Sequence, residues 1–202
     1  MKLITSLTSP FARKVRVMLA EKKIEFVLEL ENPWVAETKV PQINPLGKIP
    51  VLQLDDGTTL FDSSVIVDYL DNLGSADKLI PSDFTQRAIV KRWEALGNGI
   101  AEAAATIFLE RKRLASQQSP DWIDRQYNKV RLGLQAAADG LGNQSYCAGD
   151  RFSLADIVIG CALFYLDLRL ADVDWRKEFP NLAELASKLE KRQSFIDTVP
   201  VL

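Results

Sequence analysis

Three short segments of the sequence hold residues whose types and spacing suit the binding of an anion or a peptide. The first is Ser9-Pro10-Phe11-Ala12, which follows a short β-rich run and opens an amphipathic helix. Proline fits the first helical position, and Ser9 fits the cap, where a hydroxyl accepts a bond from the first turn. Unpaired amides and the positive end of the helix dipole also attract an anion there, and a thiolate is such an anion. The simple cap and the anion site are both open alternatives.

The second segment, Asn44 to Leu52, places Pro50 directly before a β-rich run. A cis peptide bond between Ile49 and Pro50 would turn the Ile49 backbone outward, where its N–H and C=O can pair with an extended peptide. The alternative is an ordinary proline on an edge strand after a loop. Peptide binding here therefore depends on an isomer that the sequence does not fix.

The third segment, Phe61-Asp62-Ser63-Ser64, lies between an expected hairpin and an expected helix. Either Asp62 or Ser63 can cap that helix. The same geometry points amide and hydroxyl donors at a ligand carboxylate, while the Asp62 carboxylate can hold an ammonium group. An amino acid headgroup carries both a carboxylate and an ammonium group, so it would pair with the donors and with the Asp62 carboxylate.

The elements that must position these segments alternate between strand and helix in the first part of the chain. We expect strands over Lys2–Ser6, Glu25–Leu30, Val51–Leu54 and Thr58–Phe61, and helices over Pro10–Lys23 and Ser63–Leu73. The residues Asp55-Asp56-Gly57 predict a tight hairpin between the last two strands. The second helix stops at Gly74, and the polar segment Ser75–Asp83 is the expected domain boundary.

Every long segment beyond this boundary has a helical pattern. We expect helices over Phe84–Ala115, Asp121–Leu141, Ser153–Leu170 and Asn181–Lys191, so the second domain should be all α. Ser153 and Asp156 form a predicted capping box, in which the hydroxyl of one residue and the carboxylate of the other each accept from the partner's backbone N–H. This pair is expected to be structural, because such caps stabilise a helix by roughly 1 kcal/mol.

The composition describes a folded protein with no overall attraction to polyanions. Of 202 residues, 47% are hydrophobic and 26% are charged, and 25 basic residues face 27 acidic ones, so we expect no nucleic acid partner. The longest apolar run, Ile157–Leu166, is about half the length that crosses a membrane, so we expect no membrane partner. Because the amino terminus lacks a secretory signal, the expected location is the cytoplasm.

The scarcity of cysteine and the absence of histidine limit the available chemistry. Cys147 and Cys161 lie in apolar surroundings and are expected to be core residues, since a disulfide framework or a zinc site needs more ligands. Without histidine, the chain builds neither a Ser-His-Asp triad nor a histidine-ligated metal site. We therefore expect no metal, and any nucleophile must be activated in another way.

Taken together, the order and spacing of these motifs resemble the glutathione transferase family, in particular its bacterial, serine-type cytosolic members. The opening Ser9-Pro10-Phe11-Ala12 resembles the redox opening Cys-Pro-x-Cys, with Ser9 at the first sulfur position. The segment Asn44–Leu52, the pair Asp62-Ser63 and the box Ser153-x-x-Asp156 stand where family members have them. The resemblance covers essentially the entire chain.

The resemblance implies a fold and a set of site residues. The fold would be an α/β thioredoxin-like N-terminal domain over residues 1–76, followed by an all-α helical C-terminal domain over residues 85–202. Ser9 would be the catalytic residue, whose hydroxyl stabilises the thiolate of glutathione. The glutathione-binding residues would be Ile49, through its backbone, the cis residue Pro50, Asp62 and Ser63 at the γ-glutamyl end, and Asn32 as the candidate for the glycyl carboxylate. Many relatives have glutamate where Asp62 stands.

The implied function is transfer of glutathione, as a co-substrate, to a small electrophile by a homodimeric enzyme. The electrophile would lie between the domains, against side chains around Phe11 and a helix that carries Thr106, Phe108, Arg111 and Arg113. That stretch is equally consistent with ordinary core and solvated faces. A glutathione-dependent isomerase or reductive dehalogenase could use the same thiolate site. The alternative from another class is a non-catalytic regulatory or scaffold protein that keeps the transferase fold.

Overall fold

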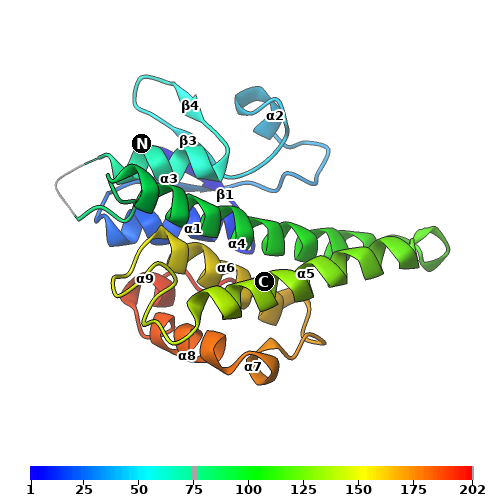
Figure 1. The fold of residues 1–202 in the computed structure, drawn as a ribbon. Coiled ribbons are helices and arrows are strands. Elements are labelled where there is room, and N and C mark those ends of the chain that lie inside the picture. The colour runs from blue at the N-terminus through cyan, green and yellow to red at the C-terminus, as the bar shows by residue number, and fades with distance from the viewer. Residues whose placement is uncertain (74–76, 202) are drawn as a thin grey trace. The chain divides into compact units, whose positions relative to one another are not determined.

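The protein is described by a computed structural model for residues 1–73 and 77–201, and its chain divides into two compact units (Figure 1). The first unit comprises Met1–Ile80 together with Lys191–Leu202, and the second comprises Pro81–Glu190. The helix stop predicted at Gly74 lies outside the described residues, as does the start of the boundary predicted at Ser75–Asp83.

The first unit is built on a four-stranded mixed sheet. Its elements are β1 (Lys2–Thr5), α1 (Pro10–Glu21), β2 (Val27–Leu30), α2 (Val40–Ile43), β3 (Val51–Gln53), β4 (Thr59–Leu60), α3 (Ser63–Asp71) and α9 (Gln193–Ile196). The strand order is β2-β1-β3-β4, with β1 parallel to β2 and β3 antiparallel to β1 and β4. The parallel pair needs a crossover, which α1 provides. This sheet confirms the expected α/β class of the N-terminal region.

The core of the first unit lies under α1 and α3, which pack against each other. The apolar positions of α1 recur at helical spacing, so they form one stripe that faces inward. Fully buried side chains come from both helices and from the central strands: Val15, Met18, Leu19, Ile66, Leu70, Leu3 and Leu52. Each such burial contributes about 1.5–3 kcal/mol relative to an exposed side chain, so the sheet and α1 form a fixed base for the residues at their ends.

The carboxyl-terminal segment belongs to the first unit because polar side chains of α1 hold it. Arg192 donates to both carboxylate oxygens of Glu21, at 3.0 and 2.8 Å, and Ser194 Oγ donates to the same carboxylate at 2.5 Å. Arg13, buried in α1, donates to the carbonyl of Phe195 at 3.2 Å. No pattern in the sequence indicated this association, which joins residues more than 170 positions apart.

The second unit is all helical, as expected for the C-terminal region. It contains α4 (Phe84–Arg111), the short 3-10 helix η1 (Ala115–Gln117), α5 (Pro120–Leu141), α6 (Leu154–Arg169), α7 (Trp175–Glu178) and α8 (Pro180–Leu189). The long helix α4 packs against both α5 and α6. A Cβ atom at Gly97 of α4 would lie 3.1 Å from the backbone of Val158 in α6, so glycine permits this close approach.

The capping box predicted at the start of α6 is present. Asp156 Oδ2 accepts from the backbone N–H of Ser153 at 2.9 Å, and Oδ1 accepts from the N–H of Cys147 at 2.7 Å. Cys147 and Cys161 are both buried, which confirms them as core residues. Burial, together with the Asp156 charge, raises the pKa of the Cys147 thiol well above its ordinary value, so the thiol is unreactive at neutral pH.

The predicted hairpin is also confirmed. Its turn places Gly57 at φ 88°, a left-handed conformation that glycine adopts without strain, and the N–H of Leu54 donates to the carbonyl of Thr58 at 2.8 Å. The sequence did not predict α2, α7 and α9, because four residues are too few to display a helical period. Across residues 1–73 and 77–201, no helix combines the length and apolar character needed to cross a membrane.

Candidate functional site

The strand directions bring the predicted glutathione-binding segments to one edge of the sheet. Because β2 runs parallel to β1 and β3 runs antiparallel to β1 and β4, the carboxyl ends of β1, β2 and β4 meet the amino end of β3. These strand ends lead to Ser9, Asn32 and Asp62 respectively, while Pro50 directly precedes β3. The first unit thus gathers at a single edge residues that lie up to 53 positions apart in the sequence.

Ser9 is the N-cap of α1 and is half-buried. Its Oγ accepts from the backbone N–H of Ala12 at 3.3 Å, a long N–H···O bond. The hydroxyl donates to no residue among those that the structure describes, so its proton is available to a ligand. The 12-residue helix that begins here adds a positive partial charge at the same point.

The backbone of Ile49 provides the second feature of this edge. The Ile49–Pro50 peptide bond is cis, which confirms the predicted isomer. Pro50 is buried and Ile49 is half-buried. Neither the N–H nor the C=O of Ile49 forms a backbone hydrogen bond within residues 1–73 and 77–201. Both groups therefore need partners from water or a ligand.

The amino end of α3 provides the third feature. Asp62 is the N-cap, and its Oδ1 accepts from the backbone N–H of Ser64 at 2.8 Å, so the predicted capping role is present. The other oxygen, Oδ2, and the hydroxyl of Ser63 bond to nothing in the part of the chain that the structure describes. Ser63 is 3% exposed, whereas Asp62 is exposed. One carboxylate oxygen and one hydroxyl therefore remain for a ligand.

Asn32 lies at the same edge but is engaged locally. It is exposed, and its Oδ1 accepts from the backbone N–H of Trp34 at 3.0 Å, which closes a short turn. The side-chain amide of Asn32 still has its N–H donors. Trp34 itself is 74% exposed, an unusual state for a large apolar side chain, and sequence reasoning did not single it out.

The side chains predicted to lie near the electrophile differ in their burial and in their hydrogen-bond partners. Phe11, in the first turn of α1, is half-buried. On α4, Thr106 donates to the carbonyl of Glu102 at 2.8 Å, and Arg113, which follows the helix, pairs with Glu110 of α4 at 3.1 Å. Both side chains are satisfied by α4, which agrees with the alternative of ordinary solvated faces.

Arg111 and a tyrosine from the next helix share one carboxylate. Arg111 Nη2 lies 3.3 Å from Asp172 Oδ2, and the Tyr127 hydroxyl donates to the same oxygen at 2.6 Å. Burial, reinforced by the Asp172 carboxylate, raises the pKa of Tyr127 to about 12, so the phenol stays protonated at neutral pH. No sequence signal links Arg111 to Asp172, because 61 positions separate them.

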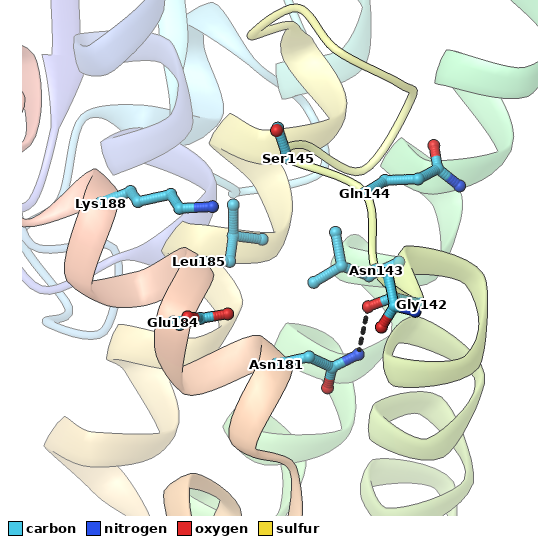
Figure 2. Close-up of a pocket in the computed structure, with 9 residues that line it drawn as sticks. Gly142, Asn143, Gln144, Ser145, Asn181, Glu184, Leu185 and Lys188 are labelled. Carbon is cyan, nitrogen blue, oxygen red and sulfur yellow. Dashed lines mark hydrogen bonds between the residues drawn. The ribbon is translucent and has the colours of Figure 1, made fainter.

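A polar pocket of about 270 Å³ lies between the end of α5 and α8 (Figure 2). The Asn181 side chain crosses it and donates to the carbonyl of Gly142 at 3.2 Å. Its lining includes one carboxylate, Glu184, and one ammonium group, Lys188, both exposed. The pocket contains none of the predicted glutathione-binding residues, and its mixed lining favours no single class of ligand.

Comparison with protein families identifies both halves of the chain. Residues 8–73 match the glutathione S-transferase N-terminal domain, and residues 120–185 match the glutathione S-transferase C-terminal domain. The first match contains the sheet edge that carries Ser9, Ile49 and Asp62. The second contains α5, α6 and α7.

Individual relatives cover nearly the whole chain. The uncharacterized GST-like protein YibF of Escherichia coli K12 is 38% identical over 200 residues, which are 99% of this chain and 98% of YibF. A glutathione S-transferase from Methylobacillus flagellatus, solved with glutathione bound, has 46% identity and a TM-score of 0.96, covering 99% of both chains. One from Methylobacterium radiotolerans, solved with glutathione sulfonate, has 42% identity and a TM-score of 0.95, covering 100% of this chain and 95% of its own. The chain therefore belongs to the glutathione S-transferase family.

Proposed function

We propose that this protein is an enzyme that transfers glutathione to a small electrophile, with the glutathione thiolate stabilised by Ser9. The observation that carries the proposal is a set of polar groups at one sheet edge that have no partner among residues 1–73 and 77–201: the Ser9 hydroxyl proton, both backbone groups of Ile49, Asp62 Oδ2 and the Ser63 hydroxyl. Buried polar groups are normally hydrogen-bonded. Because Ser63 is buried and Ser9 and Ile49 are half-buried, an edge that leaves their polar groups without protein partners is suited to a polar ligand.

The chemical task of Ser9 is to favour the anion of a bound thiol. A cysteine thiol ionises near pH 8.5, and lowering its pKa by about two units requires about 2.7 kcal/mol of preferential thiolate stabilisation. A hydrogen bond to a charged group contributes about 1.5–3 kcal/mol, and the amino end of α1 adds to it. The thiolate then forms a C–S bond with the electrophile, whose leaving group departs with the bonding electron pair, while the thiol proton has already passed to solvent.

The other edge groups would hold glutathione as an extended peptide. The N–H and C=O of Ile49, preceding Pro50, would pair with the cysteinyl unit in the manner of an added strand. Asp62 Oδ2 would accept from the γ-glutamyl ammonium group, and the Ser63 hydroxyl would donate to its carboxylate. Asn32 is proposed for the glycyl carboxylate through its side-chain N–H groups. The bound glutathione of the Methylobacillus flagellatus relative supports this ligand.

The proposal assigns the glutathione site to residues 1–76 and the completion of the electrophile site to the helical residues 85–202. A cytoplasmic location stays a prediction.

Isomerisation and dehalogenation would use the same thiolate but leave different products. An isomerase regenerates glutathione, whereas a reductive dehalogenase releases halide and oxidises glutathione. Analysis of the sulfur-containing products after turnover separates these three reactions.

The test is an ultraviolet difference titration of the protein with glutathione. Thiolate absorbance should develop about two pH units below the titration of free glutathione. In the Ser9→Ala variant, glutathione should still bind, but the thiolate signal should return toward the pH range of the free thiol. A wild-type protein that binds glutathione without a shifted thiolate would contradict catalysis and support the regulatory or scaffold alternative.

We also propose a homodimer. Each unit leaves large apolar side chains uncovered: Val65 of α3 is 49% exposed in the first unit, and Phe84 at the start of α4 is 85% exposed in the second. A two-fold dimer would bury the same patches reciprocally. Sedimentation at micromolar concentration should give twice the mass of one chain, and an active species of single-chain mass would contradict this assembly.

A further inference from the structure

The ends of α4 and α6 hold two cations against one aromatic ring. The Nζ of Lys112, which caps the carboxyl end of α4, lies 4.5 Å from the ring centre of Phe108. The guanidinium carbon of Arg169, the last residue of α6, lies 4.1 Å from the same centre. A ring face attracts cations, so Phe108 keeps both groups close together. We name Phe108, Lys112 and Arg169 the Phe108 cluster.

Within the part of the chain that the structure describes, no carboxylate forms an ion pair with either cation of this cluster. Asp172, which follows α6, is already shared by Arg111 and the Tyr127 hydroxyl. Neither Lys112 nor Arg169 forms an ion pair with any residue in the ranges 1–73 and 77–201. This differs from their neighbour Arg113, which pairs with Glu110 at 3.1 Å.

Arg169 also keeps an unused donor. Its Nε is buried and bonds to no group in the described part of the chain, although the guanidinium does bond to the Tyr165 hydroxyl. A buried N–H without a partner costs free energy that a ligand acceptor would recover. The planar guanidinium suits a carboxylate in particular, because two parallel N–H···O bonds can form.

We propose that the Phe108 cluster binds the carboxylate of the second substrate, so that the preferred electrophile is a small organic anion rather than a neutral molecule. Phe108 is half-buried, which leaves part of its ring for apolar contact with the body of the same molecule. The proposal rests on the proposed transferase function, since it names the substrate class for that reaction. The two cations and the ring that would bind the carboxylate all belong to the second unit.

The first test measures binding without chemistry. Calorimetry should compare 3,5-dinitrobenzoate with 1,3-dinitrobenzene, which has the same nitro groups but no charge and, like the benzoate, no leaving group. The wild-type protein should bind the benzoate about ten-fold more tightly, and the variants Arg169→Met and Lys112→Met should each lose most of that preference. The matched control is Arg176→Met, which removes a cation that stacks on the Trp175 ring of the same unit but is ion-paired with Asp167 and Glu190, and it should leave both affinities unchanged.

The second test measures turnover with 4-chloro-3,5-dinitrobenzoate and 1-chloro-2,4-dinitrobenzene, in which the glutathione thiolate displaces chloride. Arg169→Met should raise KM for the benzoate about ten-fold while changing KM for the neutral compound less than about two-fold. An equal loss with both electrophiles, or a wild-type protein that does not prefer the anion in either test, would overturn the proposal. The thiolate titration contains neither aromatic compound, so failure of the transferase proposal is read separately.

Discussion

The serine caps of α1 and α6 use the same local chemistry but differ in how completely it is satisfied. At α6, Ser153 Oγ lies 3.2 Å from Asp156 Oδ2, and that carboxylate also accepts two backbone N–H bonds, all of them buried. At α1, Ser9 accepts one bond at 3.3 Å and donates to none of the described residues. The cap at α6 is a closed network, whereas the cap at α1 keeps a donor for a ligand.

The difference follows from where each helix begins. The residues of α6 are buried on almost every side, so an unpaired polar group at its start would carry a full desolvation cost. The helix α1 begins at the edge of the sheet, where Ser9 is only half-buried. The type of a cap residue therefore does not decide between stability and binding; the burial of the helix end does.

The largest effect should come from breaking the closed network. Replacing Asp156 by alanine leaves the N–H groups of Cys147 and Ser153 buried without partners, which should lower the free energy of unfolding by about 3 kcal/mol. Urea denaturation measures this. The matched control is Asp83→Ala at the exposed N-cap of α4, where the loss should be about 1 kcal/mol. Equal losses at the two caps would remove burial as the distinguishing factor.

The Ser9→Ala variant tests the open cap. Its conjugation rate should fall by about ten- to a hundred-fold, which corresponds to about 1.4–2.7 kcal/mol in the transition state. Its free energy of unfolding should fall by less than about 1 kcal/mol, since only one long hydrogen bond is lost.

Ser153→Ala is the opposite control for the open cap. This variant should lose stability but keep the pH at which bound glutathione ionises, because its cap belongs to the second unit. If Ser9→Ala instead lost stability as Ser153→Ala does, with its thiolate titration intact, Ser9 would be only a helix cap.

The sequence predicted the elements well wherever a local rule governs them. The Asp-Gly turn and the Ser153 capping box follow from residues that are adjacent or three positions apart, whereas the cis Ile49–Pro50 bond was expected from the family resemblance alone. The helices α4, α5, α6 and α8 follow from long periodic patterns, with ends that differ by a few residues because helix termini fray. The grouping of Ser9, Ile49, Asp62 and Ser63 into one glutathione site comes from the motif order and the resemblance together, and it stays a prediction.

Long-range polar contacts could not be predicted. The pairing of Glu21 with Arg192 and the contact of Arg169 with the Phe108 ring join residues 171 and 61 positions apart. The sequence pattern around a charged helical residue is the same whether its partner is water, a neighbour in the helix or a distant side chain. Such contacts depend on tertiary packing, which composition and periodicity do not encode.

Replacing Ser63 should have a smaller effect, and it separates glutathione binding from the chemical step. Ser63→Ala should weaken glutathione binding about five-fold, near 1 kcal/mol, because one hydrogen bond to the ligand is lost. The rate at saturating glutathione should change little, since the proposed contact is remote from sulfur. Ser64→Ala, one position along α3, is the control and should keep wild-type affinity. Equal affinity of Ser63→Ala and the wild type would remove Ser63 from the site.

The smallest effect concerns two carboxylates whose pKa values move in opposite directions. Burial acts to raise the pKa of Glu21, but hydrogen bonds from Arg192 and Ser194 and the Arg192 charge outweigh it, so the pKa falls below its ordinary 4.5. For Asp156, burial dominates its hydrogen bonds and raises the pKa above 3.8. Two features account for the difference: Glu21 has a cation beside it and is half-buried, whereas Asp156 is fully buried and accepts from neutral groups among the described residues.

These two pKa shifts predict that the contributions of Glu21 and Asp156 to folding stability change with pH in opposite directions. Since the folded pKa of Glu21 is lowered, its contribution is present above pH 4.5 and is lost as pH falls through the folded value. The contribution of Asp156 is present at low pH and is lost as pH rises through its raised value. Glu21→Gln should therefore lose less stability than the wild type between neutral pH and about pH 4 in urea denaturation. Arg192→Met should show the same weaker dependence of unfolding free energy on pH, because it removes the cation that lowers the Glu21 pKa. If both variants lost stability with acid as the wild type does, the contact between α1 and the carboxyl-terminal segment would not be linked to the ionisation of Glu21.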